Sequence, residues 1–296
     1  MEIGMTHPVV HPQTPRVAVA SACVLGEGAL WDHRTGTVLW VDIKNPGIWR
    51  YRPETGQSSR IDVRERIGFV ALTPDPDIVV AGFKSGVARL HLFGDQTQPL
   101  VSPEPERPSN RINDGHVGPN GMLYFCTMDD DEKEPTGTFW RWDGADLSRF
   151  HGNFTVTNGP VVSPDGRTLY STDTTGGVIY AHDLADGVPG SPRPFIRFED
   201  GWGHPDGMAV DAEGHLWVCH WGGSRITRFD LNGAVERILP VPTAQVTKCA
   251  FGGADLTTLY ITTAAIGHDP TIDPMAGHLF VVETGIPGLP ARIFEG

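Results

Sequence analysis

Three polar residues lie beside glycines where the chain is predicted to enter a β-strand: Glu27 in the segment GEG, Asn158 in NG and Asp206 in PDG. Proline fixes one backbone angle and glycine permits a tight bend, so a side chain placed there is held at the strand end. Two carboxylates and a neutral amide oxygen suit a hard divalent cation and leave positions open for water and substrate. Each segment alone is also a common turn sequence, so the residues form a site only if they meet in the fold.

Other residues have side chains that suit the binding of a polar substrate. Arg111 can clamp oxygen atoms with its planar guanidinium group, and Asn113 points the same way two residues further along an extended segment. The alternative for Arg111 is simple packing against a neighbouring sheet. The acidic run 129–131 follows a strand that ends at Met128; it is typical of a solvated loop but could also hydrogen-bond sugar hydroxyls. His204 and His220 could approach the same region.

The elements that must position these residues form a repeat. Units of similar pattern begin at residues 27, 69, 113, 158, 205 and 248, so the intervals are 42, 44, 45, 47 and 43 residues. Hairpins that recur every 40 to 50 residues or so are typical of propeller blades. The sequence therefore predicts an all-β fold, a six-bladed β-propeller, closed by residues 291–294 pairing with a strand over 17–20. A β-sandwich is the weaker alternative, because it requires no regular repeat.

A propeller would bring the candidate residues together. Its innermost strands run along the central channel, so residues just before them gather at one mouth. The residues in this position come from five blades: Glu27, Arg111 with Asn113 and Asp114, Asn158, Asp206, and Lys248.

Composition excludes several classes of partner. The 296 residues include 36 acidic and 23 basic ones, for a formal net charge of −13, which argues against binding of nucleic acid. No run of about 18 apolar residues predicts a membrane span. We expect residues 1–16 to be a disordered leader and residues 17–296 to form one propeller domain, monomeric because a closed ring exposes no long sheet edge. Four scattered cysteines predict buried thiols in a reducing compartment, and with no signal peptide the predicted location is the cytoplasm.

Several segments together resemble the gluconolactonase and regucalcin family of sugar lactonases, which are six-bladed propellers. The resemblance covers about residues 23–282 and rests on LGEGALWD, RINDG, LYFCTM, TNGPVVSPDGRTLYSTDT, PDGMAVDAEGHLWV, and KCAFGG followed by LYITTA. It implies that a metal-dependent enzyme opens a small sugar lactone, either a pentono- or a hexonolactone, to the aldonic acid. It also implies one divalent cation, Ca, Zn, Mn, Mg or Fe(II), bound by Glu27, Asn158 and Asp206.

The same resemblance implies which residues contact the substrate. Arg111 and Asn113 match the family's R-x-N-D-G motif, and the family's acid after Thr-Met falls on Asp131. Many members have glutamate at that position, so Asp130 competes with the shorter Asp131. We expect Asp206 to act as the base that accepts a proton from the attacking water.

Two other functions are compatible with the same scaffold. One is a calcium-dependent phosphotriesterase, whose pocket should be apolar rather than lined by an arginine, an asparagine and acids. The other is a non-catalytic propeller that binds calcium or peptides, which would not need acids and amides at one phase of three repeats.

Overall fold

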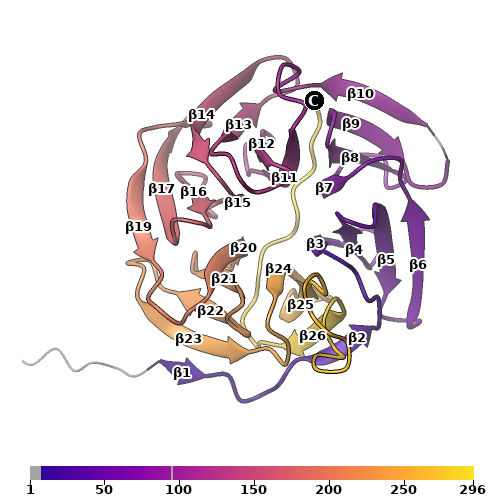
Figure 1. Ribbon diagram of the computed structural model, residues 1–296, viewed down its shortest axis with the longest axis vertical. Helices are drawn as coiled ribbons and strands as arrows, with labels where there is room; N and C mark the ends of the chain where they lie inside the picture. The colour runs from indigo at the N-terminus through magenta and orange to yellow at the C-terminus, as the bar shows by residue number, and fades with distance from the viewer. Residues whose placement is uncertain (1–7, 95) are drawn as a thin grey trace, which may run out of the picture.

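Six small sheets surround a central axis in the computed structural model, which describes residues 8–94 and 96–296 (Figure 1). This arrangement confirms the predicted all-β fold and the six-bladed β-propeller. The described residues contain no helix that is long and apolar enough to cross a membrane. All four cysteines are free and buried, as the sequence predicted.

Each blade contains four main strands that follow one another from the channel outward. The first blade comprises β3 (Gly26–Asp32), β4 (Thr37–Asp42), β5 (Gly47–Arg52) and β6 (Gln57–Asp62). The second comprises β7 (Ile67–Leu72), β8 (Ile78–Phe83), β9 (Gly86–His91) and β10 (Thr97–Val101). The third comprises β11 (Asn110–Val117), β12 (Leu123–Asp129), β13 (Gly137–Trp142) and β14 (Leu147–Phe154).

The last three blades carry the additions to this pattern. The fourth blade comprises β15 (Thr157–Val162), β16 (Thr168–Asp173), β17 (Val178–Ala185) and β19 (Arg193–Arg197), with the short β18 (Val188–Pro189). The fifth comprises β20 (His204–Val210), β21 (Leu216–Trp221), β22 (Arg225–Phe229) and β23 (Val235–Pro240), with β1 (Val9–Val10). The sixth comprises β24 (Val246–Gly252), β25 (Thr258–Thr263), β26 (Leu279–Glu283) and β2 (Arg16–Val19).

The first strand of each blade is the innermost one. Strands β3, β7, β11, β15, β20 and β24 each contact the first strand of the next blade, and β24 returns to β3. The core lies between neighbouring blades, where apolar side chains of adjacent sheets form shared clusters. This packing explains why the repeat was visible in the sequence, because each blade buries its faces only against its neighbours.

The ring closes differently from the prediction. Strand β2 pairs in antiparallel fashion with β26, with Arg16 opposite Val281, so the outermost strand of the last blade comes from the N-terminal part of the chain. The C-terminal segment, residues 284–296, instead crosses the ring towards the second and third blades (Figure 1). There the N–H of Phe294 donates to the carbonyl oxygen of Leu72 at 2.8 Å, and its ring packs on Trp142. Pairing of residues 291–294 with residues 17–20 was therefore wrong.

The predicted disordered leader is also corrected in part. Val9 and Val10 form a parallel pairing with β23, and the N–H of His11 donates to the carbonyl oxygen of Ile238 at 2.8 Å. Residues 1–7 lie outside the described part of the chain. The segment just before β2 thus extends the fifth blade by one short strand.

Candidate active site

A β-bulge interrupts the innermost strand of every blade close to the predicted site residues. Register shifts begin at Glu27 in β3, Asn158 in β15 and Pro205 in β20, and equivalent shifts occur in β7, β11 and β24. Gly28 and Gly159 follow two of the candidate ligands with φ of +61° and +70°, which glycine adopts without steric cost. A bulge bends its strand and redirects the neighbouring side chains. The same local feature therefore orients the candidate residues in each blade.

A cavity of about 440 Å³ opens where the innermost strands begin. Glu27, Arg111, Asn113, Asn158 and Asp206 line it, so the structure brings together five of the six predicted site residues. The other lining residues are Leu25, Lys44, Met128, Glu132, Thr155, Val156, Thr174, Thr175, His204, Trp221 and Ile266. The cavity therefore combines charged and hydrogen-bonding groups with apolar side chains.

The two candidate acidic ligands are buried next to other carboxylates. Exposed fractions are 6% for Glu27 and 4% each for Asn158 and Asp206. Burial, and then the negative charge of Asp114, raises the pKa of Glu27 to about 8. Burial and the charges of Glu27 and Asp114 raise the pKa of Asp206 well above its usual range. The protein's own cationic groups therefore do not fully balance the negative charges of Glu27 and Asp206.

The charge balance of this cluster fits a divalent cation. Lys248 lies inside the channel with its Nζ 2.5 Å from Oδ2 of Asp114; burial opposes the ammonium form, but Asp114 prevails and the pKa of Lys248 is raised. Glu27, Asp114 and Asp206 supply three negative charges when ionised and Lys248 one positive charge, while the charge of Arg111 is balanced by its partner Asp130, which leaves two negative charges. A bound divalent cation neutralises that surplus.

The chemistry of the donors fits the same cation. Within residues 8–94 and 96–296, no group of three or more His, Cys, Asp and Glu side chains is arranged as a metal site. The candidate site instead pairs two carboxylates with the amide oxygen of Asn158. Such an all-oxygen set is typical of hard cations and leaves coordination positions for water or substrate.

Asn113 is hydrogen-bonded both to the candidate ligand Asn158 and to Arg111. Nη1 of Arg111 donates to Oδ1 of Asn113. Nδ2 of Asn113 donates to the carbonyl oxygen of Thr157 at 2.5 Å and to Oδ1 of Asn158 at 3.1 Å. Burial lowers the pKa of Arg111. The guanidinium group is therefore part of a fixed polar network at the cavity rather than only a packing element.

The structure places Asp131 away from the cavity. Its side chain is 73% exposed and forms an ion pair with Lys133 at 3.3 Å. Asp129 organises the turn instead, because its Oδ2 accepts the N–H groups of Lys133 and Glu134 at 2.9 and 3.1 Å. The acid of this loop that lines the cavity is Glu132, whose φ of 59° turns the chain sharply. Asp131, the residue predicted to contact the substrate, therefore does not line this cavity.

Asp130, the competing residue, is surrounded by cationic side chains next to the cavity. Its carboxylate lies 2.9 Å from Lys84 Nζ, 3.1 Å from Arg111 Nε and 3.8 Å from Lys44 Nζ, and it also pairs with Arg66. Burial opposes ionisation, but these cations prevail and lower the pKa of Asp130. Its oxygens are engaged by cations, so Asp130 holds Arg111 in place and is not free to bind substrate.

Of the two histidines, only His204 reaches the cavity. Its Nδ1 lies 3.3 Å from the carbonyl oxygen of Thr174. His220 is buried inside the fifth blade with Nδ1 2.8 Å from the carbonyl oxygen of Trp202. Lys44 and Thr174 also line the cavity, although the sequence did not single out either as a site residue. Each lies just beyond the end of a second strand, β4 or β16, and that repeated position was the available clue.

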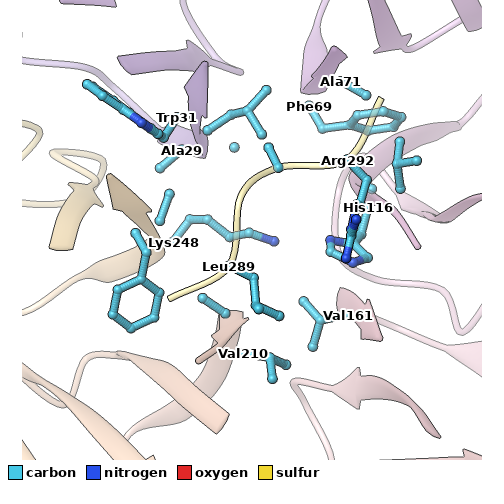
Figure 2. A pocket seen from close by; sticks show the side chains of 18 of the residues that line it. Ala29, Trp31, Phe69, Ala71, His116, Val161, Val210, Lys248, Leu289 and Arg292 are labelled. Atoms are coloured by element: carbon cyan, nitrogen blue, oxygen red, sulfur yellow. The ribbon is translucent and has the colours of Figure 1, made fainter. Parts of the chain in front are cut away.

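A second cavity, of about 130 Å³, lies near the other ends of the innermost strands (Figure 2). Residues 289–292 of the C-terminal segment cross it, and Arg292 lies beside His116. Burial, and then the positive charges of Lys248 and Arg292, lowers the pKa of His116 to about 3. The C-terminal segment thus lies across this second cavity, whereas Glu27 and Asp206 line the cavity at the end where the strands begin.

Comparisons with known proteins agree with the geometry. Residues 25–265 match the family described as SMP-30/Gluconolactonase/LRE-like region. The chain is 34% identical to L-arabinolactonase of Azospirillum brasilense, over 97% of this chain and 98% of the relative. It is 31% identical to 6-deoxy-6-sulfogluconolactonase of Pseudomonas putida, over 96% and 99% of the two chains.

Solved structures give the same assignment. The fold matches the crystal structure of a calcium-binding protein, regucalcin, from Agrobacterium tumefaciens with a TM-score of 0.94 and 26% identity, covering 98% of this chain and 100% of that one. Both the full-length match in sequence and the match in fold agree with the resemblance seen in the motifs. This chain belongs to the SMP-30/gluconolactonase/LRE-like family.

Proposed function

We propose that this protein hydrolyses a small sugar lactone to the aldonic acid with one divalent cation held by Glu27, Asn158 and Asp206. The observation that carries the proposal is the meeting of two buried carboxylates and an amide oxygen, from three blades, beside Arg111. The names of the relatives, L-arabinolactonase and 6-deoxy-6-sulfogluconolactonase, support a sugar lactone as substrate. The calcium-binding description of regucalcin supports a divalent cation.

The chemistry supplied by a bound divalent cation is Lewis-acid polarisation of the lactone carbonyl and a lower pKa of water. Asp206 accepts the proton of the attacking water at a carboxylate oxygen while the new carbon–oxygen bond forms. The ring carbon–oxygen bond then breaks, and the proton passes to the departing ring oxygen. The product acid ionises at neutral pH, so each turnover releases one proton.

The remaining polar groups position the sugar. Arg111 is held by Asp130 and Asn113, so its direction is set before substrate binds. Lys44 and Glu132 line the same cavity and offer a donor and an acceptor to ring hydroxyls. This set of groups suits a polyhydroxylated lactone better than the apolar phosphotriester of the alternative function.

A proton-release assay on pentono- and hexonolactones tests the proposal. Protein stripped with chelator is given Ca²⁺, Mg²⁺, Mn²⁺, Zn²⁺ or Fe²⁺ singly, and acid production is compared with spontaneous opening of each lactone. We expect hydrolysis only after a cation is restored. A protein that binds a cation calorimetrically but opens none of the lactones would favour the phosphotriesterase or the binding propeller.

The acidic loop gives a second test within the same assay. Glu132→Ala should raise KM about ten- to hundredfold, the cost expected for losing a hydrogen bond made by a charged group. Asp131→Ala is the matched control from the adjacent position and should leave KM unchanged, because Asp131 points into solvent. The opposite ranking of the two variants would return the substrate contact to Asp131.

A further inference from the structure

Thr174 connects two of the candidate cation ligands although it belongs to neither motif. It follows β16, is 9% exposed, and places its Oγ1 2.9 Å from Nδ2 of Asn158. The same oxygen lies 2.8 Å from the carbonyl oxygen of Pro205, the residue before Asp206. One hydroxyl thus joins Asn158 of the fourth blade to the strand of the fifth blade that carries Asp206.

The chemistry of these groups sets the direction of both hydrogen bonds. A carbonyl oxygen only accepts, so the hydroxyl of Thr174 donates its single proton to Pro205. Its oxygen must then accept from Asn158, which requires that Asn158 present its NH₂ group to Thr174. The amide oxygen of Asn158 is thereby turned to the opposite side, the side that a cation needs.

The network on that opposite side agrees with this orientation. Nδ2 of Asn113 donates to the carbonyl oxygen of Thr157 and to Oδ1 of Asn158, and Oδ1 of Asn113 accepts from Arg111. Donation therefore runs in one direction from Arg111 through Asn113, Asn158 and Thr174 to Pro205. The second lone pair of Asn158 Oδ1 stays available for a cation.

We propose that Thr174 is a positioning residue for the divalent cation: it holds the amide of Asn158 with its oxygen towards the ion and fixes the start of the strand that carries Asp206. The inference rests on the cation site of the proposed function. Without the hydroxyl, Asn158 can rotate its amide and present an NH₂ group, which repels a cation. Partners that orient a metal ligand typically alter metal affinity 10- to 100-fold.

Direct measurement of cation binding tests this role. Chelator-stripped wild type and Thr174→Val are titrated with Ca²⁺ and Mn²⁺ by calorimetry, and we expect Kd to rise about 10- to 100-fold in the variant. Thr174→Ser retains the hydroxyl and should restore binding close to the wild-type value. If Thr174→Val does not fold, Thr174→Cys, whose thiol is only a weak acceptor, takes its place.

Thr172→Val is the matched control. Thr172 lies two residues before Thr174, within β16; it is fully buried, and its Oγ1 has no hydrogen-bond partner among the described residues. The same substitution there should leave Kd unchanged. If wild type and Thr174→Val bind the cation equally well, the inference about Thr174 is wrong while the cation site stands. The same conclusion follows if Thr172→Val weakens binding as much as Thr174→Val does. Failure of the wild type to bind any divalent cation would overturn both this inference and the proposed cation site.

Discussion

Asp206→Ala is expected to lower lactone hydrolysis by about 10²- to 10⁴-fold, the usual contribution of a general base, or by more if cation binding is also lost. Asp206 is buried in the cavity among Glu27 and Asp114, where its charge is opposed by both neighbours. Removing it takes away a proton acceptor and one of two acidic ligands without opening a gap in an apolar cluster. We therefore expect the folded structure to persist, which circular dichroism in chelator checks beside the proton-release rate.

Asp206→Asn separates the two roles assigned to this residue. Asparagine keeps an oxygen that can bind a cation but accepts no proton at neutral pH. Cation binding that survives in Asp206→Asn together with lost turnover would identify Asp206 as the base. Turnover near the wild-type rate in either variant would remove Asp206 from that role and leave it at most a ligand.

Phe294→Ala is expected to lower the free energy of unfolding by about 3–5 kcal/mol, the usual cost of emptying a buried phenylalanine site. Phe294 is 1% exposed, and its ring centroid lies 5.0 Å from that of Trp142. It belongs to the apolar cluster between the second and third blades, although it comes from the end of the chain. The C-terminal segment therefore ties these blades to the opposite side of the ring.

Urea unfolding followed by tryptophan fluorescence measures this cost. Leu231→Ala is a suitable control, because Leu231 is 61% exposed and its truncation should change the free energy by no more than about 0.5 kcal/mol. If Phe294→Ala unfolds at the same urea concentration as wild type, the C-terminal segment does not hold the blades together.

Strand repetition and the candidate ligands could be predicted from local sequence alone. Glu27 and Asn158 stand where the bulges of their strands begin, Asp206 stands one residue after Pro205 at the start of its bulge, and each of the three precedes a glycine. Because every blade is built by the same hairpin pattern, equal phase in the sequence becomes nearness in space. Arg111 and Asn113 were found for the same reason.

Three features could be seen only in the tertiary structure: the closure of the ring, the acid that lines the cavity, and the pairing of Lys248 with Asp114. Closure by Arg16–Val19, rather than by residues 291–294, depends on which end of the chain reaches the open edge of the last blade. That Glu132 and not Asp131 lines the cavity depends on the backbone turn at Glu132, where φ is 59°. The pairing of Lys248 with Asp114 spans 134 residues, and its effect on the local charge appears only when the ring is closed. The sequence alone thus determined the repeat and the place of the candidate ligands within it, because both follow from local periodicity. The charge balance and the closure arise from contacts that only the assembled ring creates.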